Sequence, residues 1–297
     1  MDRILQYEIA QTLGEGKNGV AYLAIDSGLQ RAVVVKSLEK TTSAGDEDRR
    51  IAFLDQMERF NNLNNDRIAR FYSLDQAEGR WMAVREYVEG QSVADLVKSG
   101  PPAYARWLEL ALELARILKV VHDAGLAHGN VTTGNVFVAA NSTVRLTDVG
   151  LGTVLSRRDD YAEDIYVAPE LVDGNEATAA GDLYSLGVVL FYLLAERMPA
   201  VSDAESGGTL FDGLSETRVP GVARLLVRRL MAPDPKDRFG SADELILTLQ
   251  GMISLGTEPQ ASPAPRKWSP TPRQYLMLAL LVLLLIILWL AITSHPR

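Results

Sequence analysis

The chain has 297 residues, of which 47% are hydrophobic and 23% charged, which is enough for one large or two small globular domains. Its formal net charge of -8 argues against non-specific nucleic-acid binding, which needs a basic face, so nucleic acid is not an expected partner. The lack of cysteine excludes a disulfide framework and a thiolate metal site.

The first 25 residues predict two strands joined by a glycine-rich turn. Strand-like segments at 7–13 and 20–24 flank Gly14, Gly16 and Gly19, which have the spacing G-x-G-x-x-G. Taken alone, this spacing is also typical of an ordinary hairpin turn. Its place between two strands, instead of before a helix, favours a flap over bound phosphates, because glycines let backbone N–H groups approach phosphate oxygens.

A lysine follows three valines in the strand predicted over 31–38. This position is expected to be buried or half-buried, so the ammonium group of Lys36 needs a partner. A lysine that positions a phosphate fits this need, and an edge-strand lysine is the alternative. An amphipathic helix is predicted next, over 46–63. Its apolar face is expected to comprise Ile51, Leu54, Met57 and Phe60.

The middle of the chain predicts a strand that runs into a hinge over 81–90, and a long helix over 103–123. Two short strands follow within 136–147. The loop before the first of these strands, residues 128–135, reads HGNVTTGN, and the triplet DVG at 148–150 follows the second. The rest of the chain is organised around this loop and this triplet.

Three helices are predicted in the second half, over 181–195, 219–231 and 242–253, the last of them capped by Ser241. The first is apolar on all sides, which is typical of the buried centre of a helical lobe. It is too short, and too close to charged residues, to be a membrane span.

The composition changes after residue 253. Residues 254–274 contain five prolines and predict a linker with polyproline character. An uncharged run of 18 residues from Tyr275 to Ile292 follows, which is the usual minimum for crossing the hydrocarbon core. We therefore predict one transmembrane helix over 275–293 and a short extracytoplasmic tail over 294–297.

The flanking charges predict the orientation of this span. Arg266, Lys267 and Arg273 precede it, and the positive-inside rule favours the cytoplasm for that side. The first ten residues include charged Asp2 and Arg3 and no apolar h-region, so no signal peptide is expected. The expected location is the cytoplasmic membrane, single-pass, with the domain on the cytoplasmic side and the membrane as one partner.

The motifs together make the chain resemble a bacterial-type serine/threonine protein kinase domain over residues 7–253. They occur in the family's order and spacing. They are the glycine turn, Lys36, His128 with Asn135, the DVG triplet, Ala168-Pro169-Glu170, the DLYSLG run from Asp182, and Arg238. The resemblance implies a two-lobed α+β fold, with a β-rich N-lobe and a helical C-lobe, in addition to the transmembrane helix. It implies structural roles for His128, Glu170, Asp182 and Arg238, with Glu170 paired to Arg238.

The resemblance also implies a nucleotide site in the cleft between the lobes, with ATP and Mg²⁺ as cofactors. The residues expected to bind nucleotide are Gly14, Gly16, Gly19, Lys36, Glu86, Val88, Asn135 and Asp148. The last two are the implied Mg²⁺ ligands. The pocket departs from the family pattern at Ala21 and Val34, whose volumes are swapped, and at Phe137 and Arg85. A buried arginine needs a carboxylate or carbonyl partner, so Arg85 is expected to pair with Asp55 or Asp148 and to obstruct the cleft.

Four further departures fall on the catalytic machinery. Asn130 stands where the family has the aspartate that accepts the substrate proton, and an amide takes no proton at neutral pH. Thr132 stands where a lysine neutralises the transferred phosphoryl group, and Gly129 replaces an arginine. Gln56 is the expected occupant of the position whose glutamate pairs with the strand lysine, so the grip on Lys36 is expected to be weaker.

Three hypotheses follow from these residues. The first is a membrane-anchored pseudokinase that acts as a nucleotide-responsive scaffold or regulator for a protein partner that the sequence does not identify. The second is a weakly active serine/threonine kinase that transfers the ATP γ-phosphate to protein hydroxyls, because phosphoryl transfer depends more on positioning than on a base. The third is a globular domain whose resemblance is architectural only and which binds no ligand.

Overall fold

The computed structural model describes residues 3–16, 19–38, 46–139, 141–151, 164–172, 176–199, 210–212, 214 and 219–256. Contacts divide the chain into two units, residues 1–259 and 260–297, and the second unit lies outside the described residues. The predicted membrane span over 275–293 therefore lies outside them too. Within the described ranges, no helix is both long enough and apolar enough to cross a membrane.

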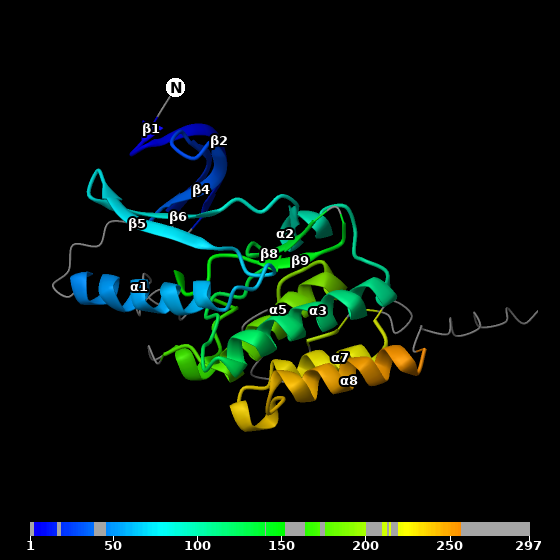
Figure 1. Cartoon of the computed structure of the whole chain (residues 1–297). Helices are drawn as coiled ribbons and strands as arrows, with labels where there is room; N and C mark the ends of the chain where they lie inside the picture. The colour runs from blue at the N-terminus through cyan, green and yellow to red at the C-terminus, as the bar shows by residue number, and fades with distance from the viewer. Residues whose placement is uncertain are drawn as a thin grey trace, which may run out of the picture. The chain divides into compact units, whose positions relative to one another are not determined.

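The N-terminal lobe is a curled antiparallel sheet with the strand order β1-β2-β3-β4-β6-β5 (Figure 1). Its strands are β1 Arg3–Ile4, β2 Tyr7–Gly16, β3 Gly19–Asp26, β4 Arg31–Ser37, β5 Phe71–Ala77 and β6 Arg80–Glu86. The central strand β4 carries three consecutive valines, Val33 to Val35, each at most 1% exposed. Because side chains alternate along a strand, Val34 and Lys36 share the face opposite Val33 and Val35.

The glycine-rich segment forms a tighter hairpin than a six-residue turn, because strand pairing continues to Gly16 opposite Gly19. Gly19 has φ +113°, and a Cβ built there would lie 1.8 Å from the carbonyl oxygen of Ser37. Only glycine fits this close approach of two backbones. Strand β5 was not predicted, although it begins with Phe71 and Tyr72, which favour strands.

Helix α1, Asp46–Asn62, confirms the predicted helix but corrects its apolar face. Phe53, Met57 and Phe60 are buried, whereas Ile51 is 57% exposed. Nine residues separate 51 from 60, and at 100° per residue they lie on opposite sides of the helix. Phe53 instead packs edge-on against Phe71 of β5, with ring centroids 5.2 Å apart.

The C-terminal lobe contains five described helices and a small sheet. The helices are α2 Val93–Val97, α3 Tyr104–Asp123, α5 Ala179–Ala195, α7 Gly221–Leu230 and α8 Ala242–Ser254. The sheet, in the order β7-β8-β9, is formed by Gln91–Ser92, Val136–Val138 and Val144–Leu146. Short 3₁₀ turns lie at Pro169–Leu171 and Pro235–Asp237. The long helices and the cap at Ser241, which accepts from Glu244 N at 3.2 Å, confirm the predictions.

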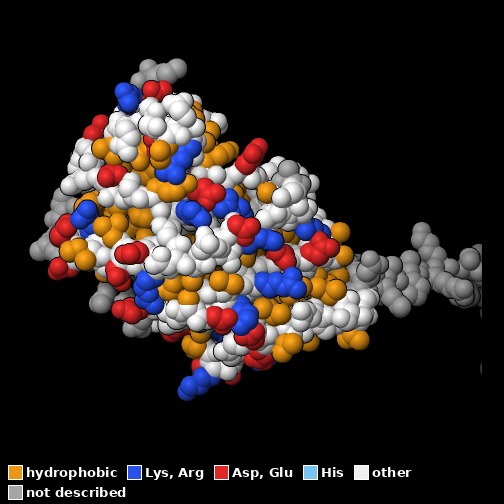
Figure 2. Space-filling model, in the orientation of Figure 1, with side chains coloured by type: hydrophobic (Ala, Val, Ile, Leu, Met, Phe, Trp, Pro, Cys, Tyr) orange, Lys and Arg blue, Asp and Glu red, His pale blue; other side chains and the backbone are white. Residues whose placement is uncertain are grey.

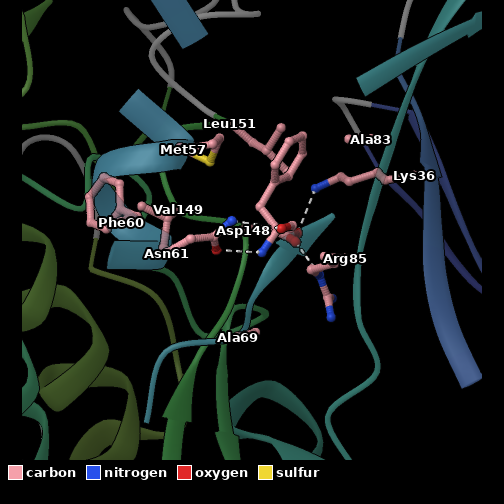
Figure 3. Close-up of a pocket in the computed structure, with 11 residues that line it drawn as sticks. Lys36, Met57, Phe60, Asn61, Ala69, Ala83, Arg85, Asp148, Val149 and Leu151 are labelled. Carbon is pink, nitrogen blue, oxygen red and sulfur yellow. Dashed lines mark hydrogen bonds and ion pairs between the residues drawn. The ribbon is translucent and has the colours of Figure 1, made fainter. Parts of the chain in front are cut away.

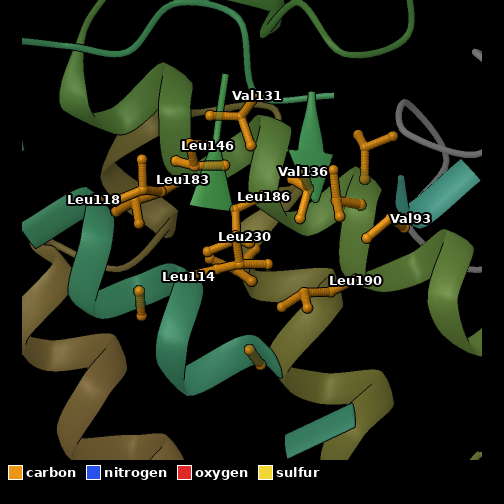
Figure 4. Packing of buried hydrophobic residues seen from close by; sticks show 14 of the residues in the cluster. Val93, Leu114, Leu118, Val131, Val136, Leu146, Leu183, Leu186, Leu190 and Leu230 are labelled. Atoms are coloured by element: carbon orange, nitrogen blue, oxygen red, sulfur yellow. The ribbon is translucent and has the colours of Figure 1, made fainter. Parts of the chain in front are cut away.

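Helix α5 is the centre of this lobe and is buried along nearly its whole length, as predicted. Figure 4 shows Leu183, Leu186 and Leu190 of α5 among apolar side chains from other elements of the lobe. These include Leu114 of α3 and Val136 of β8, both at most 1% exposed. The core therefore fixes β8, which follows the loop 128–135, and β9, which precedes the triplet 148–150.

A buried ion pair holds the lower part of this lobe and confirms the predicted Glu170–Arg238 contact. Both Arg238 Nη atoms lie 2.6 Å from the two carboxylate oxygens of Glu170. The arginine side chain is fully buried, and it also donates to the backbone carbonyls of Ala180, Ala232 and Pro233. The pair thus joins the turn before α8 to the segment before α5.

We predict that Glu170→Gln lowers the free energy of unfolding by about 3–5 kcal/mol, because it leaves the buried guanidinium charge of Arg238 without a carboxylate. Chemical denaturation of both proteins measures this difference. The matched control is Glu244→Gln, whose carboxylate pairs with Arg229 at 2.6 Å on the surface, and which should change stability by about 1 kcal/mol or less. Equal effects of the two substitutions would contradict the prediction.

Candidate functional site

An open cleft of about 900 Å³ lies between the sheet and the helical lobe, a volume typical of small-molecule sites. It is lined by residues from β2, β3 and β4, the hinge after β6, and the loop that follows α3. Of the predicted site residues, it brings together Gly14, Gly19, Lys36, Val88, Asn130, Thr132, Asn135 and Asp148. The other residues of the wall of this cleft were not predicted as site residues.

The side chain of Glu86 faces away from the cleft. Its two carboxylate oxygens accept from the Nη atoms of Arg145 at 2.8 Å each, and one of them accepts from Arg70 N at 3.1 Å. Burial raises the pKa of Glu86, but the hydrogen bonds from Arg145 and Arg70 outweigh it and lower this pKa. Glu86 could therefore contact a nucleotide only through its backbone atoms. The pairing with Arg145 was not predicted.

Asp148 is the centre of a three-residue ion cluster at the floor of the cleft. Lys36 Nζ lies 3.0 Å from one carboxylate oxygen, and Arg85 Nε donates to the other (Figure 3). The side chains of Lys36, Asp148 and Arg85 are 16%, 5% and 11% exposed. Burial alone would raise the pKa of Asp148, but the charges of Arg85 and Lys36 hold it well below its usual range. The carboxylate is therefore ionised at neutral pH.

Arg85 takes one of its two expected partners. It pairs with Asp148, and its Nη1 also donates to the carbonyl oxygen of Glu86 at 2.9 Å. Asp55, the other candidate, is exposed on α1. Side chains alternate along β6, so Arg85 shares its face with Ala83. It points away from the hydrophobic cluster on the other face of the sheet, to which Met82 and Val84 belong.

Gln56 occupies the position expected to support Lys36, but the ion pair of Lys36 is made to Asp148. The Gln56 side chain lies against the triplet instead, with Oε1 3.2 Å from a Cβ built on Gly150. Lys36 is thus paired with Asp148 and not with a glutamate of α1. The Lys–Glu pair and the free metal-binding aspartate that phosphoryl transfer uses are both missing from this arrangement.

The loop 128–135 is held from below by a buried carboxylate. Asp182 of α5 accepts from the backbone N–H groups of His128 at 2.7 Å and Gly129 at 2.8 Å, and His122 Nε2 lies 2.9 Å from it. Gly129 has φ +68°, a left-handed conformation that glycine adopts without strain. The structural roles implied for Asp182 and for the His128 position are therefore consistent with these contacts.

The amide of Asn130 is used inside the loop. Its Nδ2 donates to the backbone carbonyl of Asp148 at 2.8 Å, and Asn135 Nδ2 donates to the carbonyl of Asn130 at 3.0 Å. The first bond ties the loop to the triplet, and the second lies within the loop. An amide in this position can orient a hydroxyl group but cannot remove its proton.

Two residues beside Thr132 were not predicted. The hydroxyl groups of Thr133 and Tyr166 lie 2.6 Å apart, and Ser185 Oγ donates to the Tyr166 carbonyl at 2.7 Å. Tyr166 therefore walls the cleft next to Thr132. The position of Tyr166, two residues before Ala168-Pro169-Glu170, is the only signal in the sequence that could have indicated it.

The residues present fit a nucleotide better than a metal ion. Mg²⁺ prefers oxygen ligands, but both carboxylate oxygens of Asp148 already contact cations. Asn135 bonds within the loop through its Nδ2, so this bond leaves its amide oxygen available. In the described part of the chain, no group of three or more His, Cys, Asp or Glu side chains could hold a metal. The two cations on Asp148 therefore disfavour a divalent metal ion at this carboxylate.

Comparisons with known proteins agree with this geometry. The family model of the protein kinase domain matches residues 7–247. Serine/threonine-protein kinase PknJ of Mycobacterium tuberculosis is 29% identical over 283 residues, which cover 87% of this chain and 48% of the relative. PknB of Mycolicibacterium smegmatis is 27% identical over 296 residues, covering 92% of this chain and 46% of the relative. The chain spans about half the length, or less, of the first such relatives.

Among solved structures, the kinase domain of Mycobacterium tuberculosis PknI superposes with a TM-score of 0.63 at 24% sequence identity. The match covers 84% of this chain and 97% of that one. At this identity, the likeness shows the fold. It agrees with the two-lobed arrangement of sheet and helices.

We predict that the ring of His128 titrates far below the usual range of a histidine. Burial lowers its pKa to about 4, although the carboxylates of Asp182 and Asp148 oppose this shift. The folded-state pKa lies below the unfolded value of about 6.5, so the unfolded state binds more protons and stability falls as the pH drops. Between about pH 6.5 and 4 the loss from His128 reaches about 3 kcal/mol.

Proton NMR of the ring signals of His128 measures this pKa, and denaturation at several pH values measures the stability loss. A His128 ring that titrates between about pH 6 and 7 would contradict its burial.

Proposed function

Because the chain belongs to the protein kinase domain family, we propose that it is a kinase-like protein in which phosphoryl transfer is lost or very weak. Its role would then be that of a nucleotide-responsive scaffold or regulator. The observation that carries this proposal is Asn130, an amide at the proton-accepting position that donates its hydrogen bond to the Asp148 carbonyl. Losing a general base typically lowers a rate by about 10²–10⁴-fold.

Two further positions support the same proposal. Thr132 is neutral where a positive charge would stabilise the transferred phosphoryl group, and electrostatic stabilisation is often the largest catalytic contribution. Asp148 is shared between Lys36 and Arg85 instead of facing a metal ion. The three changes act on the same reaction, so their effects on its rate combine.

A weakly active serine/threonine kinase is the second candidate. The framework of the loop favours it, because Asp182 still holds His128 and Gly129, and Asn135 still bonds to Asn130. A loose transition state depends mainly on positioning, which this framework supplies. The hydroxyl proton would then pass to solvent.

We also propose a tether to the cytoplasmic membrane. The uncharged run of 275–293 supports it, together with the proline-rich linker 254–274 and the basic residues ahead of the run. The kinase-like domain would lie on the cytoplasmic side, with a protein partner at the membrane. Figure 2 shows acidic and basic side chains intermixed on one face of the domain, which does not resemble the basic surface that nucleic acid requires.

The first test is phosphoryl transfer by the purified full chain, with labelled ATP, Mg²⁺ and a generic acceptor protein. We expect no transfer above that of Asp148→Ala, because the base and the phosphoryl-neutralising lysine are both missing. Transfer clearly above this control would favour the weak kinase over the pseudokinase.

The second test restores the missing chemistry. Asn130→Asp with Thr132→Lys and Arg85→Leu is expected to raise transfer by about 10²-fold or more, since it returns a base and a cation and frees one oxygen of Asp148. Thr132→Lys with Asn130 retained is the matched control and should gain far less. No gain in the triple variant would mean that the loop is inactive for another reason.

The third test concerns the tether. The full chain is expected to remain in the membrane pellet after an alkaline wash and to need detergent for release, whereas residues 1–259 should be soluble. Immunoblots of the fractions measure this distribution. Release of the full chain by alkali alone would contradict a spanning helix.

A further inference from the structure

Arg85 joins two acceptors that a nucleotide site would otherwise offer to its ligand. Nε contacts the Asp148 carboxylate, and Nη1 donates to the Glu86 carbonyl at 2.9 Å. The residue lines both the cleft and a small cavity of about 20 Å³ behind it (Figure 3). The arginine therefore stands in the wall between the two spaces.

The orientation of Arg85 follows from its strand. It pairs with Val34 of β4 and Phe71 of β5 across the sheet, and its side chain lies on the face that carries Lys36. Two cationic side chains from neighbouring central strands thus point toward one carboxylate. The pairing is set by strand register, so it does not depend on a loop conformation.

The cluster of Lys36, Arg85 and Asp148 carries one net positive charge. Both carboxylate oxygens of Asp148 contact a cationic nitrogen, and the guanidinium does not lose its proton in proteins. The other acidic side chains that line the cleft are Glu15, Asp95 and Asp164. Asp95 is paired with Lys98 at 2.7 Å, so it does not neutralise the cluster.

A divalent cation would meet two obstacles at Asp148. It would have to displace Lys36 or Arg85 from a carboxylate oxygen or share that oxygen with them, and it would lie beside two positive charges in a poorly solvated site. An anionic ligand would be attracted instead, because the cluster has a surplus of positive charge. The guanidinium of Arg85 also has unused N–H groups that could donate to the ligand.

We propose that Arg85 takes the place of the divalent cation on Asp148, so that the cleft binds the phosphate groups of a nucleotide without Mg²⁺. This inference rests on the proposed nucleotide-binding role of the cleft. It assigns to a side chain of the protein the charge that a metal ion supplies in phosphoryl transfer. A metal-free nucleotide is positioned but not activated, which suits a binding role.

The test measures ATP binding to the full chain, purified in mild detergent, by isothermal titration calorimetry in EDTA and in MgCl₂. We expect the dissociation constant in EDTA to be no higher than that in MgCl₂, because the site does not need Mg²⁺ and the ion complexes ATP in solution. Electron paramagnetic resonance of added Mn²⁺ is a separate readout, and we expect no Mn²⁺ bound to the protein with or without nucleotide.

Arg85→Leu supplies the decisive comparison. It frees one oxygen of Asp148, so Mg²⁺ should now strengthen ATP binding by about tenfold or more, and bound Mn²⁺ should appear. Arg67→Leu is the matched control, because Arg67 is also a half-buried cation on a carboxylate, Glu113 at 2.7 Å, but it does not line the cleft. It should behave as the wild type. If Arg85→Leu does not fold, Arg85→Gln removes the same charge with less change of shape.

The outcomes separate this inference from the proposed function. Two results would overturn the inference alone. One is wild-type binding of ATP that is about tenfold tighter in MgCl₂ than in EDTA, and the other is an Arg85→Leu variant whose ATP binding is not strengthened by MgCl₂. Lack of ATP binding in both buffers would overturn the nucleotide-binding role and the inference with it. The transfer assay is a separate measurement that none of these outcomes decides.

Discussion

One buried carboxylate connects the core of the helical lobe to the candidate site. Asp182 belongs to α5, the most deeply buried helix described, and it is itself 1% exposed. Its oxygens accept the N–H groups of His128 and Gly129, so the start of the loop is fixed to the core by bonds to a full charge. A carboxylate so deeply buried is tolerated only because these donors satisfy it. The positions of Asn130, Asn135 and the triplet all follow from this attachment.

The same framework carries a different distribution of charge from that of a working phosphoryl-transfer site. The backbone contacts of the loop are intact, but Lys36 and Arg85 both neutralise Asp148, and Asn130 and Thr132 are uncharged. The fold depends on the hydrophobic core and on Asp182, and neither requires the missing groups. Catalysis and folding therefore rest on separate sets of residues, which allows one to be lost while the other is kept.

The sequence predicted the long helices and the central strands because periodicity constrains them strongly. The Glu170–Arg238 pair was implied by the resemblance to the kinase family. Sequence reasoning predicted the wrong face of α1 at Ile51, since a local pattern shows the period of a helix more clearly than its phase. For Arg85 it left two candidate carboxylate partners, Asp55 and Asp148, and could not decide between them. Which charged groups pair depends on distances across the sheet, as the contact between Glu86 and Arg145 also shows.

The left-handed backbone at Gly129 limits which residues this position can carry. Any side chain placed at φ +68° would add about 1 kcal/mol or more of strain, so an arginine there would be penalised before it made any contact. Glycine avoids this strain while the N–H groups of His128 and Gly129 remain directed at Asp182. The position therefore favours the turn geometry of the loop over a charged side chain.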